Sequence, residues 1–391
     1  MTPDAPRTAP GAPRVLGLLV AAAGGAAAGL PLVSAAPNRL LSGQGVRLTA
    51  LLQAEPAGWT ASAALLALGL VLGLAMLWRR PAQRAGHLLV LAALGSGLLW
   101  LLALAGRHAA AADRLTEGLG RTTPASGFWL AALLLWLAAH ETLRRLRAPA
   151  LAVTAGWALL WLALLALTAS GALDALSALK EYAERADDFW RALREHLRII
   201  GITALLTLGT GLPLGVALHR HPRWAARVFP LLNLVQTIPS VALFGVLMGL
   251  LPALGLRGVG LAPAVLALTA YSLLPLVRST CEGLAQLPRA VTESATAMGL
   301  SRRQLLWQVE LPLALPVLLA GLKVMLIQTI GLTAVAALIG AGGLGALMFE
   351  GLFSSALDLV VLAVVPMVAL AWLAEGLFVA AGALARRWAQ G

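Results

Sequence analysis

The chain has 391 residues, of which 60% are hydrophobic and only 12% are Asp, Glu, Lys or Arg. Soluble proteins are about half apolar and about a quarter charged, so an ordinary soluble enzyme and a disordered polypeptide are both excluded. The formal net charge of +12 does not indicate a nucleic-acid partner, because the arginines form short clusters between apolar runs, which is typical of a polytopic protein surrounded by membrane lipid.

Long apolar stretches predict an all-α fold with about ten transmembrane helices, since a hydrocarbon layer of about 30 Å requires roughly 20 apolar residues. The first half of the chain contributes residues 15–35, 61–78, 87–105, 128–140 and 149–173. The second half contributes residues 199–218, 228–251, 259–277, 313–338 and 357–384.

The arginine clusters predict the orientation, because cytoplasmic loops are enriched in Lys and Arg. With the N-terminus inside, the cytoplasmic side receives the clusters that begin at Arg79, Arg144 and Arg220, the segment 278–308 and the C-terminal pair Arg386 and Arg387. The sequence therefore predicts a multi-pass protein with both termini in the cytoplasm. One alternative stays open, because residues 33–35 resemble a signal-peptide cleavage site.

A charged stretch at residues 173–198 separates the two halves. Apolar residues such as Leu176, Leu179 and Phe189 recur there at helical spacing, with charged residues between them. We interpret this stretch as an extracytoplasmic amphipathic helix, either a linker or a dock for an external partner. The predicted domains are an N-terminal membrane extension of about five spans at 1–172, this linker at 173–198, and a membrane core at 199–391.

A cytoplasmic loop at residues 279–312 interrupts the predicted core. Pro288 is suited to the first turn of a helix and Gly299 to its C-terminal end. Ser301 and Gln304 have the spacing of a capping box that opens a second helix, and Pro312 marks its entry into the membrane. The loop is therefore expected to form a helix, a glycine turn and a second helix.

The same loop resembles the EAA loop of ATP-binding-cassette (ABC) importer permeases. That motif reads Glu-Ala-Ala, three residues, Gly, nine residues, an aliphatic residue, any residue, Leu and Pro. This chain has Glu293-Ser294-Ala295, Gly299 and Val309-Glu310-Leu311-Pro312 at matching spacings, with Ser294 in place of the first alanine and Val309 in place of the usual isoleucine. In that family the loop fits a cleft of the cytoplasmic ATPase subunit. The resemblance thus implies an ATPase-coupling role for Glu293, Ser294, Ala295, Gly299, Leu311 and Pro312.

A wider resemblance covers about half of the chain, from His196 to Arg387. The sequences at 236–240, 271–275, 309–316 and 339–345 resemble the osmoprotectant branch of these permeases, which imports glycine betaine, choline or proline betaine. The five preceding spans resemble the longer Yeh-type members of that branch. The resemblance implies a type I ABC importer core in the C-terminal half and a location in the bacterial inner membrane.

The same resemblance implies several partners. Cytoplasmic ABC ATPase subunits would hold ATP and Mg, and an extracytoplasmic binding protein would deliver the solute. A second permease chain would complete the path, either as a homodimer or as a shorter paralogous permease.

Catalytic and cofactor motifs are not expected in this chain. A Walker A loop requires Gly-Lys-Ser/Thr, whereas the two lysines, Lys180 and Lys323, both follow leucine. Residues 340–345 match the dinucleotide pattern G-x-G-x-x-G, but they follow a predicted membrane helix rather than a strand, which favours a glycine-rich turn. Neither a metal site nor a nucleophile–His–acid set is predicted, so we expect a transport subunit and not an enzyme.

Polar side chains inside the predicted spans are candidates for the translocation path, because unpaired polar atoms in hydrocarbon are costly. They are Gln236, Thr237, Ser240, Tyr271, Ser272, Gln328 and Thr329. Hydrogen bonding between helices is an equally good interpretation. Glu375 is the clearest carboxylate deep in a span, and the sequence shows no obvious partner for it. A packing or cavity role is therefore favoured over a proton relay.

Three other functions stay open. The solute could be different, such as an amino acid or another quaternary amine. A secondary transporter driven by an ion gradient would need buried carboxylates, for which Glu375 alone is thin support. The first five spans could sense osmotic stress.

Overall fold

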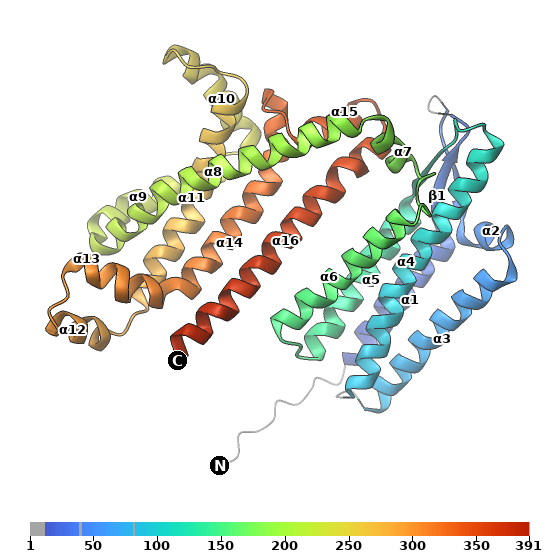
Figure 1. Ribbon diagram of the computed structural model, residues 1–391, viewed down its shortest axis with the longest axis horizontal. Coiled ribbons are helices and arrows are strands. Elements are labelled where there is room, and N and C mark those ends of the chain that lie inside the picture. The colour runs from blue at the N-terminus through green and yellow to red at the C-terminus, as the bar shows by residue number, and fades with distance from the viewer. Residues whose placement is uncertain (1–11, 39–40, 81–82, 391) are drawn as a thin grey trace. The chain divides into compact units, whose positions relative to one another are not determined.

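The computed structural model describes residues 12–38, 41–80 and 83–390, which fold as two compact units that divide after Ala183 (Figure 1). The side chains of residues 12–13 and 386–390 are outside the described part, so the predicted cytoplasmic pair Arg386 and Arg387 is not placed. Each unit has its own buried core.

The N-terminal unit consists mainly of helices that pack lengthwise against one another (Figure 1). Its elements are α1 (Ala12–Gly29), β1 (Pro31–Ala36), β2 (Gln44–Arg47), α2 (Leu48–Gln53), α3 (Ala57–Arg79), α4 (Arg84–Leu115), β3 (Arg121–Pro124), α5 (Ser126–Arg145), α6 (Ala150–Ala169) and α7 (Ser177–Glu184), the last of which ends at the division between the units.

The C-terminal unit is helical throughout its described residues. Its elements are α8 (Ala186–Arg220), α9 (Pro222–Thr237), α10 (Ser240–Ala253), α11 (Leu261–Ala285), α12 (Arg289–Ala297), α13 (Arg302–Gln304), the π-helical turn η1 (Leu305–Glu310), α14 (Leu311–Val335), the 3₁₀ turn η2 (Ala336–Ile339), α15 (Leu344–Phe353) and α16 (Leu357–Gln390).

Eight helices of the described chain are long and apolar enough to cross a membrane. They are α3, α4, α5, α6, α8, α11, α16 and the continuous helix from Arg302 to Ile339 that contains α14. The bent pair α9 and α10 makes a ninth span when counted as one, and α1 is a shorter apolar helix. Every predicted span therefore corresponds to a helix or to this bent pair, although the first helix ends at Gly29 rather than at residue 35.

The break between α9 and α10 bends the chain by 104° at Pro239. Proline has no backbone N–H and disfavours helical geometry in the residue before it. Ile238 accordingly adopts an extended conformation, with φ −71° and ψ 128°. Pro239 then acts as the N-cap of α10, so the proline explains the change of direction.

A small sheet in the N-terminal unit is a difference from the all-helical expectation. β1 is the central strand of a three-stranded antiparallel sheet in the order β2-β1-β3. Leu32 and Val33 of β1 are fully buried. The residues that resemble a signal-peptide cleavage site, 33–35, lie within this strand. The sequence predicts a longer first span because Leu32 and Val33 continue the apolar run of α1.

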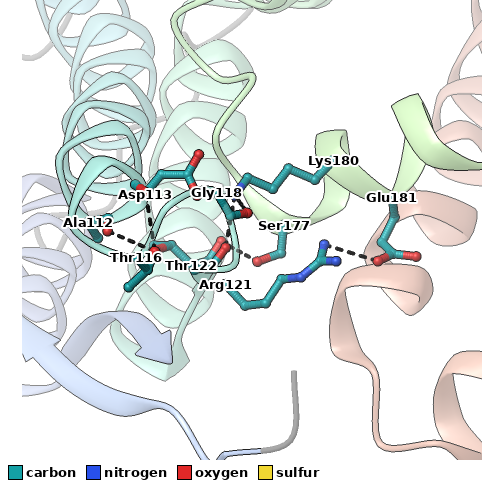
Figure 2. Close-up of polar contacts among 10 residues, drawn as sticks. Ala112, Asp113, Thr116, Gly118, Arg121, Thr122, Ser177, Lys180 and Glu181 are labelled. Carbon is teal, nitrogen blue, oxygen red and sulfur yellow. Dashed lines mark hydrogen bonds and ion pairs between the residues drawn. The ribbon is translucent and has the colours of Figure 1, made fainter. Parts of the chain in front are cut away.

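A network of polar contacts fastens α7 to the loop that follows α4 (Figure 2). The ammonium group of Lys180 pairs with Asp113 and donates hydrogen bonds to the carbonyl oxygens of Gly118 and Gly120, at 3.1 and 2.9 Å. Next to it, the fully buried Glu181 forms an ion pair with Arg121 at 3.1 Å. We call these contacts the α7 clasp; Ser177 Oγ adds a 3.0 Å hydrogen bond to the carbonyl oxygen of Thr122.

The predicted linker at 173–198 is divided between two helices in the structure. α7 ends at Glu184 and α8 begins at Ala186, with Arg185 between them. Glu181 and His196 are fully buried, so parts of this stretch are packed into protein rather than lying on a surface. α8 then continues for 35 residues in total, which joins the second part of the linker directly to the first span of the core.

Candidate functional site

The first helix of the loop predicted at residues 279–312, α12 (Arg289–Ala297), ends in a well-defined glycine turn. The N–H of Gly299 bonds the carbonyl of Thr296 at 2.9 Å, and the N–H of Leu300 bonds that of Ala295 at 3.3 Å. This pair of bonds is the Schellman motif, which requires a left-handed residue after the helix. Gly299 supplies it with φ +86°, a conformation that is unfavourable for side chains with a β-carbon. The predicted C-terminal glycine of this helix is thus confirmed.

The start of the following helix is also formed by local sequence. Ser301 and Gln304 make a reciprocal capping box, as predicted. The chain then passes through the π-helical turn η1 before α14 begins at Leu311. Such turns occur often at functional sites. Glu310 of η1 contacts Arg220 at the end of α8 at 3.5 Å, so α8 is connected to the loop by an ion pair.

The coupling residues named from the motif differ in exposure. Glu293, Ser294, Gly299 and Pro312 are exposed, whereas Ala295 is buried and Leu311 is partly buried. The exposed residues are accompanied by two large apolar side chains, Met298 at 81% and Trp307 at 64% exposure. Whether these two side chains contact another protein stays a prediction of the sequence resemblance. We call residues 288–312 the coupling loop.

Hydrogen bonds join polar residues of neighbouring spans in two places. Ser272 of α11 and Thr329 of α14 lie 2.9 Å apart through their hydroxyl oxygens and are both fully buried. Gln236 of α9 donates to the carbonyl of Tyr271 at 2.6 Å and accepts from Gln328 at 3.5 Å. These contacts join three helices, and they favour the helix-joining interpretation for the buried pair.

The remaining path candidates lie close to the bend at Pro239. The Tyr271 hydroxyl donates to the carbonyl of Ile238, and the Thr237 hydroxyl donates to that of Leu234 at 2.8 Å. Ser240 is partly buried at the start of α10. The structure thus brings Gln236, Tyr271 and Gln328 together beside the bend, whereas Ser272 and Thr329 form a separate hydrogen bond that is fully buried.

Glu375 has a partner that sequence analysis missed. Its carboxylate accepts a hydrogen bond from Lys323 of α14 at 2.9 Å, which forms an ion pair between two spans. The residues are 52 positions apart, so local spacing gave no signal. The available clue was that Lys323 is a lysine within an apolar span, which is rare unless the charge is paired.

Two comparisons with known families match separate parts of the chain. Residues 12–179 match the N-terminal domain of the ABC transporter permease YehY. Residues 209–389 match the binding-protein-dependent transport system inner membrane component.

Relatives extend this match. The osmoprotectant import permease protein OsmW of Salmonella typhimurium is 42% identical over 41% of this chain and 74% of its own length. The chain belongs to this permease family. The choline transport system permease protein OpuBD of Bacillus subtilis is 35% identical over 50% of this chain and 88% of its own. A chain of the methionine ABC transporter MetNI, in an inward-facing conformation, is 24% identical over 50% of this chain and 95% of its own, with a TM-score of 0.47.

Membership in this family shows what kind of complex the permease belongs to. The permease is a multi-span subunit of an ABC importer in the bacterial inner membrane, and such importers work with ATPase and substrate-binding partners. Within the described residues, no group of three or more His, Cys, Asp or Glu side chains is placed to hold a metal ion.

The glycine-rich sequence at 340–345 forms a tight turn against α8 of the permease. Gly340, Gly342 and Gly343 all have positive φ angles. The N–H of Gly343 donates to the carboxylate of Glu195 at 3.1 Å. At Gly345, a β-carbon would lie 2.0 Å from the carbonyl oxygen of Ala334, so only glycine fits where α15 packs against the end of α14. The glycines therefore serve close packing of helices.

Proposed function

We propose that this permease imports quaternary-amine osmoprotectants such as glycine betaine or choline, coupled to ATP hydrolysis on a separate subunit that holds ATP and Mg. The substrate class is supported by OsmW and OpuBD, whose names specify osmoprotectants and choline. A third relative, OpuCD of Bacillus subtilis, is named for glycine betaine, carnitine and choline and is 38% identical over 43% of this chain and 74% of its own. The observation that carries the proposal is this agreement among the substrates that the relatives' names specify.

The coupling loop is the proposed contact with the ATPase. Its helix ends at the Gly299 turn, and its exposed Glu293, Ser294 and Met298 offer one charge, one small polar side chain and one large apolar side chain. Ala295 is buried and is therefore not part of the exposed surface of this helix. When ATP binding closes two ATPase subunits, the loop would move with them and draw on α14 through Leu311 and Pro312. The ion pair between Glu310 and Arg220 would carry the same movement to α8.

The proposed transport cycle is alternating access between two states that bind the ATPases differently. An extracytoplasmic binding protein would deliver the solute. A second permease chain, identical or a shorter paralogue, would pair with the second ATPase. Both termini are assigned to the cytoplasm, which places the coupling loop on the same side as ATP. Gln236 and Gln328, half-buried beside the bend at Pro239, are assigned to the path.

The test is uptake by a bacterial host that lacks its own betaine transport and carries this chain with its ATPase and binding protein. Labelled glycine betaine, choline and an amino acid such as proline would be compared at matched concentrations. We expect uptake of glycine betaine or choline that requires both partners. Uptake of the amino acid alone would support an ABC permease and show that its solute is an amino acid rather than a quaternary amine. Absence of uptake for all three would contradict the proposed substrate class.

A further inference from the structure

The Lys323–Glu375 ion pair lies near the centre of the membrane-spanning part. Lys323 is roughly 18 Å along α14 from Leu311, and Glu375 is roughly 16 Å along α16 from the Arg386 position, at 1.5 Å of rise per residue. Both distances are close to half of a hydrocarbon layer of about 30 Å. In secondary transporters the substrate sites lie near the bilayer midplane, and a solute that crosses this permease must also pass that depth.

One flank of this pair is open. The side chains of Lys323 and Glu375 retain 32% and 39% exposure, whereas Ser272 and Thr329 of the neighbouring polar pair are fully buried. A charge that faces hydrocarbon at this depth is strongly unfavourable, so an open flank there must border water or another protein chain. Where water borders it, a solute can reach this pair, whereas the fully buried Ser272–Thr329 pair is out of its reach.

Aromatic side chains stand on both sides of the carboxylate along α16. Trp372 precedes Glu375 by three residues and Phe378 follows it by three, so all three share one side of the helix. Each is partly buried. A quaternary ammonium has no N–H to donate, so proteins bind it by electrostatic attraction and by the faces of aromatic rings, tryptophan above all. The carboxylate and its aromatic neighbours have this chemistry.

We propose that Lys323, Trp372, Glu375 and Phe378 form a transient binding site for a zwitterion with a quaternary ammonium and a carboxylate. In the resting permease the two charged residues neutralise each other. The passing solute exchanges with this pair: its ammonium lies against Glu375 and the aromatic rings, and its carboxylate accepts hydrogen bonds from Lys323. The solute and the Lys323–Glu375 pair each carry one positive and one negative charge, so the net charge of the site stays zero throughout. The inference rests on the proposed function, because it requires a solute of that class.

The test compares a zwitterion with a cation in the complete transporter. Labelled glycine betaine and choline would be supplied at saturating concentrations to proteoliposomes that contain the permease, its ATPase and its binding protein. The variants are Lys323→Met, Glu375→Gln and the charge-reversed Lys323→Glu/Glu375→Lys. Lys180→Met, the same substitution at the other lysine of the chain, is the matched control. The ratio of the two uptake rates is independent of how much protein reaches the membrane.

We expect Lys323→Met to lower the betaine-to-choline ratio about tenfold, because the charge-assisted contact to the carboxylate is lost while the contacts to the ammonium remain. Glu375→Gln should lower both rates, and Lys180→Met should leave the ratio unchanged. The charge-reversed variant should stay impaired, since its lysine would stand between the aromatic rings.

An unchanged ratio in Lys323→Met, or full recovery in the charge-reversed variant, would assign the pair to helix packing. The proposed binding site would then be overturned, and the proposed function would remain. If the wild type carries betaine but not choline, no ratio can be formed, and betaine uptake by the charge-reversed variant is the test. Impaired uptake supports the site, and full recovery overturns it. A wild type that carries neither solute overturns the proposed function and this inference with it.

Discussion

The two units of the permease place their charged contacts at different depths. In the N-terminal unit, Lys180 and its partners lie where α4 ends and α7 begins, and the spans themselves are free of Asp, Glu, Lys and Arg over residues 58–78, 85–106, 126–140 and 150–169. In the C-terminal unit, the other lysine of the chain, Lys323, is paired near the middle of a span. Since intramembrane charges are costly and mark function by default, we propose that transport belongs to the C-terminal unit, and we expect the N-terminal unit to have a supporting role.

The spans of the two units also differ in how much of their surface is buried against other helices of the same unit. The apolar stretch of α11 is half buried within its unit, whereas that of α6 has no buried residue. Inward-facing small and polar residues hold α11 against α8 and α14, as expected for helix association in membranes. α6 instead exposes large apolar residues such as Leu159 and Leu162, which suit a lipid environment.

The largest expected effect concerns the turn that ends the coupling helix. Replacing Gly299 by Val should lower transport at least tenfold, because a β-branched residue is strongly disfavoured at φ +86°. Membrane insertion should persist, since there is open space around this position. Uptake and ATP hydrolysis would be measured together. The matched control is Gly299→Asn, because Asn tolerates the left-handed conformation; equal loss in both variants would contradict the backbone explanation.

Two glycines with similar crowding give a direct comparison of the units. A β-carbon at Gly345 would lie 2.0 Å from the carbonyl oxygen of Ala334, and one at Gly106 would lie 2.2 Å from that of Ala172. Overpacking of this kind costs about 1–3 kcal/mol or more. Gly345→Ala should therefore abolish most transport, whereas Gly106→Ala should lower thermal stability and leave uptake per inserted molecule within about threefold.

The contrast between the two units would be contradicted if Gly106→Ala lowered uptake more than Gly345→Ala. Loss of uptake in Gly106→Ala, with normal amounts of protein in the membrane, would mean that the N-terminal unit takes part in transport. Gly17→Ala is a suitable control, because no atom lies within 4 Å of a β-carbon at that position.

The smallest expected effect on transport concerns the α7 clasp. Lys180→Met removes one ion pair and two hydrogen bonds to carbonyl oxygens, and the loss of such a partly buried set should cost about 1–3 kcal/mol of stability. Thermal unfolding of the purified protein would report this change. Uptake should stay within about twofold of the wild type. A collapse of uptake would show that the clasp transmits movement to α8 rather than fastening α7.

The parts of the molecule that sequence predicted are those specified by neighbouring residues. Gly299, Ser301 and Gln304 act on backbone groups within four residues of themselves, so their spacing was enough to predict the helix, the turn and the capping box. The spans follow equally from uninterrupted apolar sequence.

The parts that sequence did not predict depend on distant or competing contacts. Lys323 and Glu375 meet only after α14 and α16 have packed, so neither residue signals the other. β1 continues the apolar composition of α1, and its pairing with β2 and β3 outweighs helical preference there. The π-helical turn η1 is a shift in backbone hydrogen bonding that no residue in 305–310 demands. The coupling and path roles of the named residues stay predictions.

The most direct test of the account is the energy source of uptake. Proteoliposomes would contain the permease with its ATPase, with binding protein on the solute side and ATP on the other, and labelled glycine betaine uptake would be followed with and without ionophores. The account predicts uptake that requires ATP and the binding protein and that persists when ionophores dissipate all ion gradients. Uptake that proceeds without ATP and stops with ionophores would contradict it.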